Sequence, residues 1–98
     1  MLSEKDIFIG KTIIIGLTFL DNINQKVQRR QLSGTISDIN EKGIFVNLDE
    51  GGVYTLPPDV SAIQAAPPGE YEFESTGKVV VNPDYMTTWR IYKPDIND

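Results

Sequence analysis

The sequence predicts an all-β fold, a small barrel of six or seven short strands with one or two short helical turns. Two patterns support this: short runs rich in β-branched and aromatic residues, and turn signals rich in glycine, proline, asparagine and aspartate between them. Such spacing is typical of β-sandwiches and barrels. For a chain of 98 residues we expect a barrel, because closure removes exposed sheet edges.

The first part of the chain is expected to hold a helical turn and a strong strand. Ser3 can cap a turn over residues 4–9 that Gly10 ends. Residues 12–20 form the clearest strand, because isoleucine, threonine and phenylalanine favour a pleated surface, and residues 21–25 form a hairpin loop. Both strand faces are partly apolar, so we expect both to be covered. One face carries Ile13, Ile15, Leu17 and Phe19, and the other carries Ile14, Gly16, Thr18 and Leu20.

The second strand, residues 26–39, has apolar residues in two phases. Val27 lies at an odd position, whereas Ile36 lies at an even one. Because alternation is strict in an unbroken strand, the phase must shift between them. We expect a bulge or sharp bend near Ser33 and Gly34 to supply that shift.

The remaining chain alternates short strands with turns. Proline cannot donate to a ladder, so the proline pair at 57 and 58 ends a strand, and Asp59 can cap a helical turn over residues 60–63. We expect a single domain over residues 1–98, with residues 94–98 as a frayed tail. The other strands are expected over residues 44–49, 53–56, 70–74, 79–81 and 86–92.

Composition removes several kinds of chemistry. The chain has no cysteine and no histidine, which excludes disulfides, thiolate nucleophiles, histidine catalysis and the usual zinc sites. We expect no metal and no cofactor. No apolar run approaches the roughly 20 residues of a membrane helix, and residues 1–6 lack the basic and apolar regions of a secretory signal. The net charge of −5 disfavours nucleic acid as a partner unless the cations cluster.

Four motifs stand out in the second half of the chain: Leu56-Pro57-Pro58-Asp59, Pro67-Pro68-Gly69-Glu70-Tyr71, Ser75-Thr76-Gly77 and Pro83-Asp84-Tyr85-Met86-Thr87-Thr88-Trp89. Together they resemble a group of small bacterial proteins of uncharacterised function. The resemblance implies a bacterial, cytoplasmic protein with one compact domain. It assigns no catalytic or binding residue.

Residues 32–36, 43–48 and 54–57 form a second pattern. Their rhythm of strand and turn resembles that of SH3-like and Sm-like small barrels, and it implies an SH3-like barrel here. The Sm-like resemblance would imply RNA binding. However, the chain lacks a matching pair of loop Asp/Asn and Arg-Gly signatures that would line an RNA pore.

The second half also carries the candidate binding residues. Small barrels often receive an extended peptide on an aromatic and proline-rich surface, although tyrosines at such positions can equally close the ends of a barrel. A row of glutamates about 7 Å apart on one strand face is either an acidic patch for a basic partner or a solvated face. We expect a non-enzymatic binding module for a protein or peptide. Its candidate residues are Tyr54, Asp59, Glu70, Glu72, Glu74 and Tyr85.

Three alternative functions stay open. The negative charge would suit an acidic inhibitor or immunity-type protein that neutralises a basic partner. A carboxylate-based enzyme requires two acids to converge in a pocket, and the acids in question are Asp38, Asp49, Asp59 and Asp84. Nucleic-acid binding requires the scattered cations to share one surface, and these are Lys26, Arg29, Arg30, Lys78 and Arg90.

Overall fold

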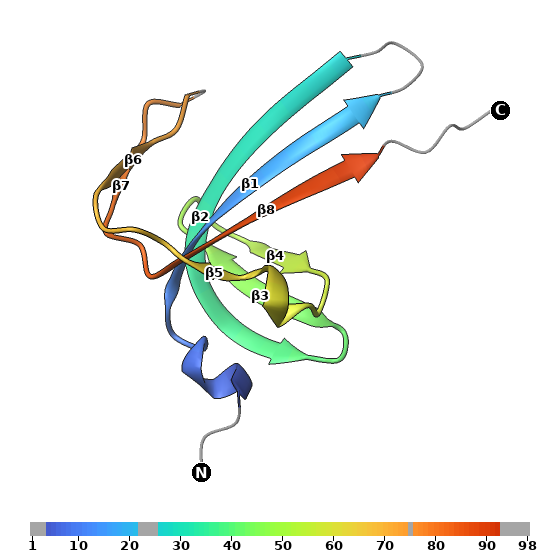
Figure 1. Ribbon diagram of the computed structural model, residues 1–98, viewed down its shortest axis with the longest axis vertical. Helices are drawn as coiled ribbons and strands as arrows, with labels where there is room; N and C mark the ends of the chain where they lie inside the picture. Colours follow the sequence, from blue (N-terminus) through green and yellow to red (C-terminus); the bar gives the residue numbers. More distant parts are fainter. Residues whose placement is uncertain (1–3, 22–25, 75, 93–98) are drawn as a thin grey trace, which may run out of the picture.

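The computed structural model describes residues 4–21, 26–74 and 76–92. In these residues it has a six-stranded sheet and a separate two-stranded hairpin (Figure 1). The helical turns are η1 (Glu4–Ile7) and η2 (Val60–Ala62). The strands are β1 (Thr12–Asp21), β2 (Lys26–Asn40), β3 (Gly43–Leu48), β4 (Val53–Leu56), β5 (Gln64–Ala65), β6 (Glu70–Glu72), β7 (Val79–Val81) and β8 (Tyr85–Tyr92).

The predicted all-β class is confirmed, as are two short helical turns. Seven strands correspond to expected ranges, and β5 is the addition. It has two residues, too few for alternation to reveal it, and it pairs antiparallel with the start of β8. The Ser3 cap, most of the 21–25 loop and the 94–98 tail lie outside the described residues.

The six-stranded sheet is open. Its order is β4-β3-β2-β1-β8-β5, so β4 and β5 are its edges. Pro57 directly follows β4, and Pro67 lies two residues after β5. Because proline has no N–H to donate to a ladder, it limits the length of both edge strands. In the described residues β4 and β5 do not pair, so the sheet does not close into a barrel, and the likeness to SH3-like and Sm-like barrels stays a prediction.

Strand β1 is central, paired antiparallel with β2 and parallel with β8. Side chains at the start of both parallel strands hold them together. The Asp84 carboxylate accepts hydrogen bonds from the N–H and the hydroxyl of Thr12, each at 3.0 Å, and the Asp84 N–H donates to the same hydroxyl. This contact immediately precedes the pairing of Ile13 with Tyr85, so it fixes the parallel register.

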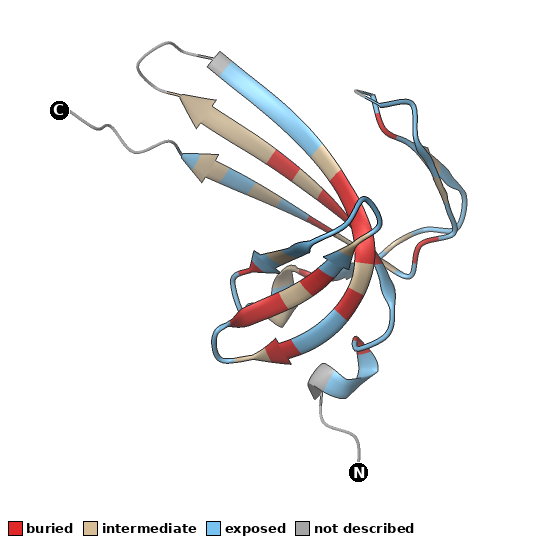
Figure 2. Cartoon of the chain, turned by 180° about the vertical axis from the view of Figure 1, so that it is seen from behind, coloured by how far each residue is buried: buried red, intermediate tan, exposed pale blue. Residues whose placement is uncertain are grey.

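One face of β1 forms the core. Ile13, Ile15 and Leu17 are at most 2% exposed, as the alternation predicts. Along β2, residues 27–30 are exposed and residues 32–34 and 36 are buried, and β3 is mostly buried or half-buried (Figure 2). The core residues from the other elements are Phe8, Leu32, Ile36, Ile39, Ile44, Val46, Leu56 and Ile63.

The opposite face of β1 is covered only near its beginning. Ile14 is buried. Phe73, which directly follows strand β6 of the β6–β7 hairpin, is buried as well. Both residues line one hollow beneath the hairpin. Farther along β1, Gly16, Thr18 and Leu20 are only half-buried. The prediction that both faces are covered therefore holds for the first part of the strand alone.

The bulge in β2 lies at a different position from the expected one. The register with β3 shifts between Ile36 and Asp38, not at Ser33 and Gly34. Val27 is 56% exposed. It is not a core residue, so its odd position requires no shift in the alternation of β2. Gly34 is required for the packing of β2 against β3. The two strands approach so closely that a Cβ at Gly34 would collide with the carbonyl of Asn47.

Two glycines with opposite surroundings give a direct test of this packing. We expect Gly34→Ala to destabilise the protein by about 2–3 kcal/mol, because the clash is with backbone that cannot move aside. Gly16→Ala meets just the Thr88 methyl, at 3.3 Å, and should change stability by less than about 1 kcal/mol. Urea unfolding followed by the fluorescence of Trp89, the single tryptophan, measures both. Equal stability of the two variants would contradict the close β2–β3 approach.

Candidate functional site

The six residues expected to bind do not form one surface. Tyr54 and Tyr85 are half-buried and pack against the core, and the Tyr85 ring lies edge-on to Phe8. Asp59 caps η2 by accepting a hydrogen bond from the Ser61 N–H at 3.0 Å. Glu70, Glu72 and Glu74 are exposed on and beside β6, on the other side of the central strands from β4 (Figure 1). Their role in binding stays a prediction.

The aspartates of the enzyme alternative each make local contacts. Asp38 accepts a hydrogen bond from the Ile39 N–H, and Asp49, Asp59 and Asp84 contact Ser33, Ser61 and Thr12 respectively. Among the described residues, no group of three or more acidic side chains could hold a metal ion. Neither helical turn in the described part of the chain has the length or apolar character to cross a bilayer.

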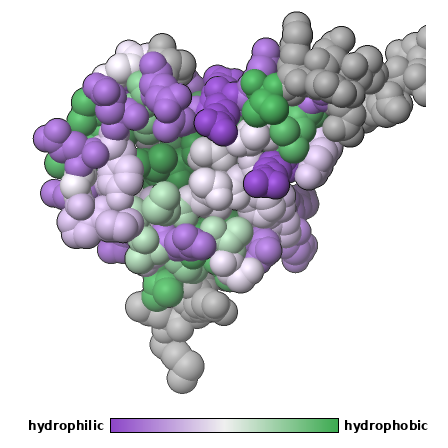
Figure 3. All heavy atoms as spheres, turned by 45° about the horizontal axis from the view of Figure 1, so that its top comes forward, coloured by the Kyte–Doolittle hydropathy of each residue, from purple (hydrophilic) through white to green (hydrophobic). Residues whose placement is uncertain are grey.

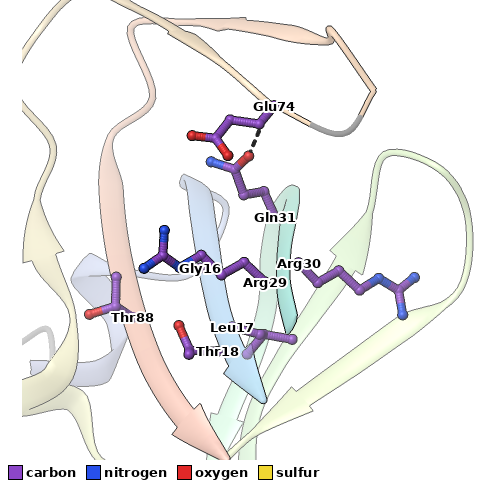
Figure 4. Close-up of a pocket in the computed structure, with 8 residues that line it drawn as sticks. All are labelled: Gly16, Leu17, Thr18, Arg29, Arg30, Gln31, Glu74 and Thr88. Carbon is purple, nitrogen blue, oxygen red and sulfur yellow. Dashed lines mark hydrogen bonds between the residues drawn. The ribbon is translucent and has the colours of Figure 1, made fainter. Parts of the chain in front are cut away.

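The structure instead gathers polar side chains on the partly covered face of β1, β2 and β8, which we call the polar face. Cross-strand neighbours share a face. Gly16 therefore lies between Gln31 and Thr88, and Thr18 lies between Arg29 and Arg90. A hollow of about 450 Å³ opens over these rows. It is lined by Gly16, Leu17, Thr18, Arg29, Arg30, Gln31, Glu74 and Thr88 (Figure 4).

A second hollow, of about 340 Å³, continues under the β6–β7 hairpin. The two hollows share Gly16, Gln31 and Thr88 as lining residues. The hairpin forms the wall at this point, where the Glu74 N–H donates a hydrogen bond of 2.9 Å to Oε1 of Gln31. The result is one groove that runs from the hairpin along the polar face.

The floor of the groove is a glycine in the middle of a doubly paired strand. The backbone atom nearest to a Cβ added at Gly16 would be the carbonyl oxygen of Thr87, at 3.9 Å. The φ angle of Gly16 is not in the positive range. Glycine in a strand interior costs about 0.5–1 kcal/mol relative to alanine. No turn or close backbone approach requires it here, and its missing side chain is what leaves the surface concave.

The two neighbouring arginines of β2 point in opposite directions, as alternation predicts. Arg29 reaches across β1 over Gly16 toward Thr88, whereas Arg30 points away from the groove (Figure 4). Arg30 lies 3.5 Å from Glu50 in an exposed ion pair. The cations required for nucleic-acid binding are thus divided between faces, and Lys78 is engaged elsewhere.

Lys78 fastens the hairpin to the sheet in a contact we call the hairpin clamp. Its Nζ donates to the Ser33 hydroxyl at 2.9 Å and to the Asp49 carboxylate at 3.0 Å. The Ser33 hydroxyl in turn donates to the same carboxylate at 2.7 Å. The hydrogen bonds from Ser33 and Lys78, with the charge of Lys78, lower the pKa of Asp49 against a smaller opposing effect of burial.

The clamp is better explained as a fastening than as a reactive centre. A serine nucleophile needs a neighbouring base that can take its proton. The Lys78 ammonium is paired with Asp49, so it donates to the hydroxyl rather than accepting from it. Both charged side chains are about half exposed, at 40% and 51%. The contact joins the residue directly before β7, strand β2 and the β3–β4 turn.

Comparison with known proteins finds no relative of this chain. No protein-family model, no curated protein and no solved structure matches the chain. The proposed function therefore depends on the geometry of the groove.

The residues of the groove were missed in the sequence for two reasons. Gly16 interrupts an isoleucine-rich strand, and that local signal of a concave or closely approached position was available. Arg29 and Arg90 are separated by sixty residues, and they share a row only because β1 and β8 pair in parallel. No local sequence pattern predicts the parallel pairing of β1 with β8.

The hairpin clamp should weaken in acid. Because the folded pKa of Asp49 is lowered, its stabilising contribution is complete above the ordinary aspartate pKa near 4 and is lost as pH falls through the folded value. We expect hydrogen-exchange protection of the Phe73 amide, which donates to the Lys78 carbonyl, to fall between pH 5 and pH 3 relative to the Ile36 amide in the main sheet.

Two variants separate this effect from general acid unfolding. Asp49→Asn should lower Phe73 protection at pH 5 toward the level of the unaltered protein in acid, and abolish most of its pH response. Asp84→Asn removes the other aspartate with a lowered pKa and should leave the response of the hairpin intact. An unchanged response in Asp49→Asn would contradict the assignment.

Proposed function

We propose that this chain is a small binding module that holds an extended segment of a partner protein or peptide in the groove of the polar face. The observation that carries the proposal is Gly16. It leaves a concave floor across three paired strands although its backbone conformation demands no glycine, and the one tight neighbour of an added Cβ is the methyl of the exposed Thr88 side chain, at 3.3 Å. A position that costs strand stability without a structural reason is a candidate for function.

The dimensions and lining of the groove suit a peptide. The adjoining hollows of about 450 and 340 Å³ are in the size range of ligand sites. Gln31, Thr18 and Thr88 offer hydrogen-bonding groups along the floor, and Phe73 and Met86 offer apolar contact near the hairpin. An extended chain alternates its side chains, so it can use both kinds of contact at once.

A segment of a larger partner fits the groove better than a small molecule does. Small-molecule sites bury most of the surface of the ligand. Arg29, Glu74 and Thr88 are exposed here, so a small ligand would keep much of its surface in water. A peptide gains further contacts along the strands beyond the hollow. The bacterial, cytoplasmic setting that the sequence motifs imply is part of the same proposal.

Filling the floor should weaken binding without harming the fold. We expect Gly16→Val to weaken peptide binding by about tenfold or more, because even single methylene changes in a pocket alter binding by about 10- to 200-fold. Valine favours strands, and the exposed Thr88 side chain can turn aside. The measurement is retention of the labelled protein on an array of immobilised decapeptides of random sequence, with urea unfolding as the check on folding.

Val53→Thr is the matched control, since Val53 is 61% exposed on edge strand β4 and lies outside the groove. It should bind the same peptides as the unaltered protein. If no peptide is retained by the unaltered protein, or if Gly16→Val retains the same peptides with equal affinity, the proposed function is wrong.

A further inference from the structure

We propose that the partner segment is acidic, and that its carboxylate is bound by an arginine row formed by Arg29, Thr18 and Arg90. This inference rests on the proposed function and names the chemistry of its ligand. The row crosses three strands on the polar face, because Thr18 pairs with Arg29 on one side and with Arg90 on the other. Adjacent strands lie about 4.8 Å apart, so the two arginine backbones are about 10 Å apart and both side chains can reach one anion above Thr18.

Neither arginine is neutralised within the part of the chain that the structure describes. The ion pairs there join Arg30 with Glu50 and Lys78 with Asp49, and Arg29 and Arg90 take part in neither. Both are exposed. In a protein of net charge −5, two unpaired arginines on one row form a local reversal of charge. A carboxylate suits this row, since guanidinium groups bind carboxylates through parallel charge-assisted hydrogen bonds.

The groove has a direction because its two rows differ in charge. Glu74 borders it at the Gln31 row, one row nearer the hairpin than Arg29 and Arg90. A carboxylate of the partner is attracted by Arg29 and Arg90 and repelled by Glu74, which lies nearer the hairpin. The acidic side chain therefore lies away from the hairpin.

The next row outward is apolar. Leu20 pairs with Val27 and with Tyr92 on the same face, and Val27 and Tyr92 are 56% and 59% exposed. The face of the molecule seen in Figure 3 carries both strongly hydrophilic and hydrophobic side chains. Two residues along a strand span about 7 Å. An extended partner with an acidic residue at one position and an apolar residue two positions away matches both rows.

The composition of the retained peptides tests the inference. On the array of random decapeptides, we expect peptides bound by the unaltered protein to be several-fold enriched in aspartate or glutamate two positions from an apolar residue. Arg29→Gln and Arg90→Gln should each weaken binding of those peptides by about five- to tenfold, because a charge-assisted hydrogen bond is replaced by a neutral one. Both residues are exposed, so these variants are expected to fold.

Lys42→Gln is the matched control, because it also removes one positive charge from an exposed side chain and Lys42 lines neither hollow of the groove. Its binding should stay within about twofold. An equal loss in Lys42→Gln would show that net charge alone is responsible, and it would overturn the inference. Bound peptides without acidic enrichment would also overturn it while leaving the proposed function intact, whereas retention of no peptide would contradict both.

A phosphate group is the alternative anion, and a second arm of the experiment separates it. Serine-containing versions of the retained peptides are compared with their phosphoserine counterparts and with the acidic originals, and inorganic phosphate is added as a competitor. We expect the acidic originals to bind without phosphorylation and to resist millimolar phosphate. Binding that requires phosphoserine would overturn the assignment of a carboxylate.

Discussion

The register of the central strand is the constraint on which the rest of the structure depends. Strand β1 is paired on both sides, so each of its residues defines a row across three strands. Odd positions such as Ile15 make the rows of the core, and even positions such as Gly16 and Thr18 make the rows of the groove. A shift of one residue would exchange the two faces. The Thr12–Asp84 contact holds the β8 side of this register at its beginning.

The hairpin is held to the sheet mainly by burial and only secondarily by charge. Burying a phenylalanine side chain contributes about 1.5–3 kcal/mol, and Phe73 is 3% exposed. A half-exposed ion pair such as Lys78 with Asp49 contributes less than about 1 kcal/mol. The apolar contact therefore determines that the hairpin docks. The clamp and the Gln31–Glu74 hydrogen bond determine where it docks, and thus where the groove has a wall.

Local pattern predicted the elements well and their assembly less well. The alternation of Ile13, Ile15 and Leu17 revealed the core face, and the prolines after β4 marked where that strand ends. The open sheet, the bulge after Ile36 and the parallel β1–β8 pair depend on contacts between distant segments. The groove belongs to this second class, because its arginines meet through pairing. The expected binding residues were chosen by chemical type, and residues of a suitable type also serve as caps and as packing.

An acidic protein that binds an acidic segment faces two opposing electrostatic effects, and they act over different distances. The net charge of −5 repels the partner, but at physiological ionic strength that repulsion is screened beyond about 8 Å. The attraction of Arg29 and Arg90 acts at contact, where water is partly excluded and screening is weaker. The long-range effect lowers the association rate, and the contact governs dissociation. Local charge reversal therefore favours slow, selective recognition of the few acidic segments whose apolar neighbour also fits the row of Leu20, Val27 and Tyr92.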